Sequence, residues 1–138
     1  MTDTIGAALR AARETLSTIQ PDALAEREAR LILAHATGLS QAALVSATSD
    51  PLPADAAQKI DAALTARLAR QPISQILGQI EFYGRPFRVT ADVLTPRPDT
   101  EALIDVALAA PFTRVLDHGT GNGCILATLL AERPGTTG

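Results

Sequence analysis

Residues 114–133 read RVLDHGTGNGCILATLLAER and set the expected fold class of the last third of the chain. The apolar run before Asp117 predicts a short buried strand, and the apolar run that begins after Gly123 predicts a helix. Between them, Gly119 and Gly121 predict a tight turn at which a ligand can come close to the main chain. A strand, a glycine-rich turn and a helix in this order are typical of the first unit of a doubly wound α/β sheet.

The spacing of the glycines favours one class of ligand over another. Dinucleotide sites use G-x-G-x-x-G, with the pyrophosphate at the helix N-terminus, whereas this loop reads G-T-G-N-G after an acid. That pattern resembles the first motif of S-adenosylmethionine-dependent methyltransferases. Such a cofactor has no pyrophosphate, so the loop would pack against its methionine and ribose portions while a carboxylate faces its ammonium group. The resemblance implies these cofactor-binding residues: Asp117, Gly119, Thr120, Gly121, Asn122 and Gly123. A glycine-rich turn without a ligand is the alternative interpretation.

The first seventy residues predict a small bundle of four helices, because apolar residues recur there at three- and four-residue steps. The second helix begins at Pro21 and ends at Gly38, and Ser40 caps a short third helix. The charged run EREAR at 26–30 is interpreted as a solvated helix face. Apolar stripes mark the first and the fourth helix: Ile5, Leu9, Ala12, Leu16 and Ile19, and then Ala57, Ile60, Leu64 and Leu68.

Residues 79–90, QIEFYGRPFRVT, alternate apolar with polar side chains around Gly84. This pattern predicts two short strands joined by a turn. The aromatic residues Phe82, Tyr83 and Phe87 are expected to seal this hairpin against its neighbours rather than to stack on a ligand.

Residues 95–110, TPRPDTEALIDVALAA, predict a helix with a firmly specified start. Two prolines precede it, and the acids Asp99 and Glu101 lie in its first turn, at the positive end of the helix dipole. The residues expected to face the interior are Leu103, Ile104, Val106, Ala107 and Leu108.

Three motifs occur in one order: EFYG at 81–84, PRPDTE at 96–101 and GTGNG at 119–123. Together they closely resemble the HemK/PrmC family, the N5-glutamine methyltransferases of peptide-chain release factors. The PRPDTE motif places Arg97 and Glu101 beside the cofactor side of the fold in that family. Three residues depart from its usual pattern: Asp99 replaces a glutamate, His118 an apolar residue and Gln75 an aromatic one.

The resemblance also implies a division of the chain. Residues 1–71 would form an α-helical bundle of the release-factor-binding type, and 72–91 a β-hairpin linker. Residues 92–138 would begin a Rossmann-like class I methyltransferase domain of α/β type, here incomplete. The family's catalytic Asn-Pro-Pro-Tyr motif is absent from this sequence, so no catalytic residue is assigned. We therefore expect a fragment that is inactive by itself and binds the cofactor poorly.

The activity implied is transfer of a methyl group from S-adenosylmethionine to the glutamine side-chain nitrogen of the Gly-Gly-Gln motif in class I release factors. Two other hypotheses remain: the helical domain is a docking module for release factors, or the enzyme methylates an amine on nucleic acid. The net charge of −3 and the absence of a basic stripe argue against a nucleic-acid partner.

The amino-acid composition indicates which compartment and which kinds of site to expect. No apolar run approaches the roughly twenty residues that a membrane helix needs. Cys124 is the single cysteine, which fits a reducing compartment, and it is interpreted as a packing residue. His35 and His118 are the only histidines and lie far apart in the sequence, so no metal site is predicted and His35 is assigned to a helix surface or a core. We expect a cytoplasmic protein without a membrane partner.

Overall fold

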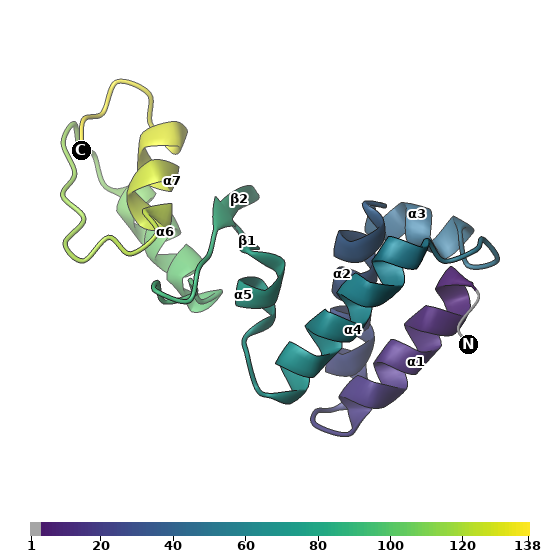
Figure 1. The fold of residues 1–138 in the computed structure, drawn as a ribbon. Helices are drawn as coiled ribbons and strands as arrows, with labels where there is room; N and C mark the ends of the chain where they lie inside the picture. Colours follow the sequence, from purple (N-terminus) through teal and green to yellow (C-terminus); the bar gives the residue numbers. More distant parts are fainter. Residues whose placement is uncertain (1–3) are drawn as a thin grey trace. The chain divides into compact units, whose positions relative to one another are not determined.

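The structure is a computed structural model that describes residues 4–138 (Figure 1). The described chain divides into two compact units, with the division between Leu77 and Gly78. We call residues 4–77 the helical unit and residues 78–138 the glycine-loop unit, and describe each by itself.

The helical unit contains the four predicted helices and a fifth, short one. Their bounds are α1 Ile5–Ser17, α2 Asp22–Thr37, α3 Gln41–Ser46, α4 Ala54–Leu68 and α5 Ile73–Leu77. The predicted ends are confirmed: the Ser40 hydroxyl accepts the Ala43 N–H at 3.1 Å, and Gly38 ends α2 at φ +72°. Helix α5 was not predicted, because five residues are too few to show a helical period.

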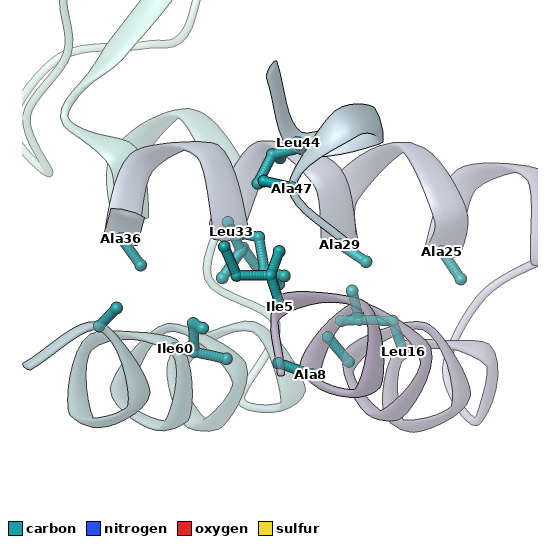
Figure 2. Close-up of a cluster of buried hydrophobic side chains, with 13 residues drawn as sticks. Ile5, Ala8, Leu16, Ala25, Ala29, Leu33, Ala36, Leu44, Ala47 and Ile60 are labelled. Carbon is teal, nitrogen blue, oxygen red and sulfur yellow. The ribbon is translucent and has the colours of Figure 1, made fainter. Parts of the chain in front are cut away.

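The core of the helical unit is lined by small side chains. Helices α1, α2 and α4 lie side by side in Figure 1. Figure 2 shows Ala25, Ala29 and Ala36 pointing from α2 toward the other two helices. The predicted stripes supply Ile5, Ala12, Leu16 and Ile60 to this core, whereas Leu68 is 41% exposed. The buried residues are Ile5, Ala8, Ala12, Leu16, Ala25, Ala29, Ile32, Leu33, Ala36, Leu44, Ala47, Ala56 and Ile60.

Gly6 lets the first turn of α1 approach the segment after α3. Its N–H donates to the Thr48 carbonyl at 2.9 Å, and a Cβ built on Gly6 would lie only 2.7 Å from that oxygen. We expect Gly6→Ala to destabilise the helical unit by about 1–3 kcal/mol, because overpacking outweighs the gain of about 1 kcal/mol in helix propensity. Urea denaturation followed by far-UV circular dichroism measures the difference. A more stable variant would show that the backbone at Thr48 yields freely.

The run EREAR was predicted to be a solvated helix face. This prediction is wrong for Glu28, which is only 4% exposed. Its Oε2 accepts a hydrogen bond from Arg67 Nε at 2.8 Å and another from Gln20 Nε2 at 2.8 Å. Arg67 Nη2 also donates to Gln20 Oε1 at 3.0 Å. These three side chains form a closed polar cluster that ties α2 to α4 and to the connection before α2. Burial of Glu28 is tolerated because its charge is paired and hydrogen-bonded.

The glycine-loop unit begins with the predicted hairpin, which is confirmed. Strands β1 (Gln79–Phe82) and β2 (Arg85–Arg88) pair antiparallel, with Phe82 opposite Arg85 at the turn. The two turn residues, Tyr83 at φ +50° and Gly84 at φ +71°, are both left-handed. This conformation suits a two-residue hairpin, because its twist matches that of the strands.

Two helices complete the glycine-loop unit, α6 (Asp99–Ala109) and α7 (Cys124–Glu132), and both were predicted. They lie side by side in Figure 1. The interior contains Phe82, Ile104, Cys124 and Leu129, with Phe87 packed against it. The rings of Phe82 and Phe87 meet edge to face at 6.1 Å. Tyr83 and Phe87 also pack against the cluster that Phe82 forms with residues of α6 and α7, so the expected packing of the hairpin against its neighbours is confirmed.

Two predictions for this unit are wrong. No strand forms over 114–117; the described residues show there only an isolated parallel bridge between Arg114 and Thr137, and Leu116 is 88% exposed. A strand requires a neighbour that takes its backbone hydrogen bonds, and among residues 4–138 the hairpin is the only sheet. The Rossmann-like sheet is therefore not seen in the described chain. Leu103 and Val106 are 52% and 70% exposed instead of interior, because α6 turns its Ile104 face to the core.

Candidate functional site

The predicted cofactor-binding residues lie in one loop that leads into α7. Gly119, Gly121 and Gly123 have φ values of +79°, +56° and +78°, a region that residues with a Cβ rarely adopt. A Cβ at any of the three would meet nothing within 4 Å. The glycines are therefore required by backbone conformation rather than by crowding, and space remains open beside the main chain of the loop.

Hydrogen bonds inside the loop fix its shape. The Thr120 hydroxyl donates to Asp117 Oδ2 at 3.0 Å, and the Gly123 N–H donates to the Thr120 carbonyl at 2.8 Å. The first bond fixes the orientation of the Asp117 carboxylate, which is half-buried. An oriented carboxylate beside open main chain can accept hydrogen bonds from a cationic group such as an ammonium.

Asn122 connects the loop to its surroundings. Its Oδ1 accepts the Cys124 N–H at 3.3 Å, at the start of α7, and its Nδ2 donates to the Arg88 carbonyl at 3.4 Å. Both polar atoms of the Asn122 side chain are thus directed at protein groups, one on each side of the loop. Sequence reasoning assigned Asn122 to the cofactor without foreseeing either contact.

Cys124 lies below the loop as a packing residue, as predicted, with 5% of its surface exposed. Burial raises the pKa of its thiol above the ordinary value, and the negative charge of Asp117 adds to this increase. A thiol with a raised pKa is protonated at neutral pH and is not an activated nucleophile.

The other residues singled out from the sequence have the following places in the structure. Glu101 Oε1 accepts the backbone N–H of Tyr83 at 2.8 Å, and Arg97 is exposed just before α6. His35 is exposed on α2, which agrees with its assignment to a helix surface rather than to a core. His118 is exposed within the loop.

Within residues 4–138, no three His, Cys, Asp or Glu side chains are grouped so that they could hold a metal ion. None of the helices in that range is long and apolar enough to cross a membrane.

Sequence reasoning missed the contacts that join the hairpin to α6. A signal for them is present at Tyr83, because the first central position of such a turn ordinarily takes Asn, Asp or Gly. An aromatic residue at this position indicates that its side chain or its N–H has a partner elsewhere.

Comparison with known proteins gives one consistent result. Residues 7–78, more than half of the chain, match the family model of the PrmC N-terminal domain. The sequence is 56% identical over 131 residues to the release factor glutamine methyltransferase of Cereibacter sphaeroides, covering 95% of this chain and 47% of that protein. Proteins of the same name from Rhodospirillum rubrum and Escherichia coli are 44% identical over 115 residues and 38% over 125. These alignments cover 81% and 88% of this chain, and 35% and 45% of the two relatives. The chain spans less than half the length of these curated relatives.

Proposed function

Since the chain belongs to the PrmC family of release factor glutamine methyltransferases, we propose that the full-length protein methylates class I peptide chain release factors. The target is the side-chain nitrogen of the glutamine in their Gly-Gly-Gln motif, and the reaction takes place in the cytoplasm. The methyl donor is S-adenosylmethionine, held by the loop over 117–123. The observation that supports this assignment is the open main chain beside three left-handed glycines and the Asp117 carboxylate.

The described residues have a defined part in this reaction. When bound, S-adenosylmethionine supplies an electrophilic methyl group. Asp117, oriented by Thr120, would accept hydrogen bonds from an ammonium group, and Gly119 and Gly121 would let the ligand contact bare backbone. An amide nitrogen is a weak nucleophile, so the rate depends on how precisely the two reactants are oriented. A fixed loop conformation contributes to that precision.

The helical unit has a second proposed role, as the surface that binds the release factor. The support is that the match to the PrmC N-terminal domain, residues 7–78, coincides with the compact helical unit. A pull-down of release factor with the helical unit tests this role separately from catalysis.

Gly121→Val in the full-length protein tests the cofactor assignment. Valine is strained at φ +56° and its side chain would occupy the open space, so we expect the affinity for S-adenosylmethionine to fall at least tenfold. Calorimetry measures the affinity, and transfer of a labelled methyl group to release factor measures activity.

A matched control is Gly38→Ala, which places a side chain at an equally left-handed glycine at the end of α2. This variant should lose stability but keep its cofactor affinity. If Gly121→Val binds the cofactor as tightly as the unchanged protein, the loop is not the cofactor site. If a release factor whose Gly-Gly-Gln glutamine is replaced by alanine still accepts the label, the proposed target is wrong.

A further inference from the structure

The hairpin turn holds an uncommon residue in an uncommon conformation. In the described chain, Arg70 and Tyr83 are the non-glycine residues with positive φ. A left-handed conformation is unfavourable for a residue with a side chain, so contacts elsewhere must hold Tyr83 in it. Residues in such uncommon backbone conformations persist where several contacts from the surrounding structure hold them in place.

Helix α6 provides the first set of these contacts. The Tyr83 N–H donates to Glu101 Oε1 at 2.8 Å, and the Tyr83 hydroxyl donates to Asp105 Oδ1 at 2.8 Å. Glu101 and Asp105 are four residues apart, so they lie on the same face of α6. Both acceptors are carboxylates, which form the stronger, charge-assisted class of hydrogen bond.

Helix α7 provides the second set, through Arg85. The Arg85 guanidinium donates to the Tyr83 carbonyl at 3.3 Å and forms an ion pair with Glu132 at 2.6 Å. The turn is therefore tied to both helices of the glycine-loop unit. We call these contacts of Tyr83 and Arg85 with Glu101, Asp105 and Glu132 the turn clasp.

Strand β2 leads from the turn clasp to the glycine loop. It begins at Arg85 and ends at Arg88, whose carbonyl accepts the side-chain N–H of Asn122 at 3.4 Å. The same asparagine accepts the Cys124 N–H at 3.3 Å. A displaced turn would move β2, and with it the carbonyl that anchors the loop.

We propose that Glu101 is a positioning residue, which holds the hairpin turn on α6 so that β2 can fix the glycine loop through Asn122. Glu101 acts through Tyr83 and does not touch the cofactor. The inference rests on the proposed function for the identity of the loop's ligand. The bond also links two of the sequence motifs, because the donor Tyr83 belongs to EFYG and the acceptor Glu101 belongs to PRPDTE.

The test compares Glu101→Ala with Glu101→Gln in the full-length protein. Alanine removes the acceptor, whereas glutamine retains an Oε1 that can accept the Tyr83 N–H. Hydrogen exchange at Tyr83 and at residues 119–124 reports on the clasp and the loop without any ligand. We expect faster exchange at both places in Glu101→Ala, and a cofactor affinity reduced about five- to tenfold. Glu101→Gln should recover most of both losses.

Glu81→Ala is the matched control, because Glu81 is an exposed glutamate on the same hairpin, outside the clasp. It should leave exchange in the loop unchanged. If exchange in Glu101→Ala rises at Tyr83 but not in the loop, the coupling through β2 is refuted, while the result for Gly121→Val still decides the cofactor site. A weaker affinity with unchanged loop exchange would assign Glu101 a direct contact with the cofactor and would also overturn the proposal.

Tyr83→Phe covers the case in which Glu101→Ala does not fold. This variant keeps the ring and removes only the bond to Asp105. We expect a smaller increase of exchange over the same residues, 119–124. Unchanged exchange in the loop of this variant would count against the proposal.

Discussion

Glu28→Ala is expected to lower the free energy of unfolding of the helical unit by about 3–5 kcal/mol, the usual cost of breaking a buried ion pair from one side. The Glu28 and Arg67 side chains are 6% and 16% exposed, and Glu28 Oε2 lies 2.8 Å from Arg67 Nε. Removing the carboxylate leaves the guanidinium without its charged partner in a place that water scarcely reaches. Gln20 also loses the acceptor of its side-chain N–H.

Urea denaturation followed by the helical circular dichroism signal measures this loss. The matched control is Asp55→Ala, which breaks a pair of nearly the same length, 2.9 Å to Lys59, whose side chains are 72% and 56% exposed. Water screens an exposed pair of this kind, so Asp55→Ala should lower the free energy of unfolding far less than Glu28→Ala. Equal losses in the two variants would show that burial does not strengthen the Glu28 pair. Replacing Glu28 and Arg67 together by leucine should recover most of the stability, because no unpaired charge then remains.

Phe82→Ala is expected to destabilise the glycine-loop unit by about 3–5 kcal/mol, through lost burial and the cavity left behind. Phe82 is 1% exposed and lies between the hairpin and the two helices, in contact with the ring of Phe87. The other buried residues of this interior are Ile104, Cys124 and Leu129, all smaller than Phe82, so few atoms could fill the space that Phe82 leaves.

The loss can be followed in the glycine-loop unit alone. The sequence has a single tyrosine, Tyr83, and no tryptophan, so its intrinsic fluorescence reports on this unit. Phe87→Ala is the control, because Phe87 is only half-buried and should cost less. If Phe87→Ala proves as costly as Phe82→Ala, the two rings act as one unit and burial alone does not set the cost.

Local signals in the sequence were sufficient where neighbouring residues decide the structure. Ser40, Gly38 and the proline-rich start of α6 fix the ends of helices through contacts within a turn. The hairpin could be predicted for the same reason. Helix α5 is too short for a periodic signal. The strand predicted over 114–117 does not form, because a strand depends on a neighbouring strand, which no local pattern contains.

The burial of single side chains and the contacts between distant segments could not be predicted from the sequence. EREAR has the composition of a solvated face, and the ion-pair partner of Glu28 is Arg67, 39 residues further on, so no local pattern shows that Glu28 is buried and paired. The glycine loop could be predicted because its left-handed residues must be glycine. The bond from Tyr83 to Glu101 could not, because its donor is a backbone N–H, which every residue except proline carries.

The alanine-rich interior of the helical unit has a consequence for entropy. Seven of the thirteen buried hydrophobic residues in its described core are alanines. An alanine has no rotamers to lose when it is buried, so ordering this interior costs little side-chain entropy. Each alanine also removes little apolar surface from water when it is buried. The helix backbones must therefore come close together, so that enough apolar surface is buried to stabilise the unit. With few rotamers to exchange, the helices of this unit have few alternative ways to pack.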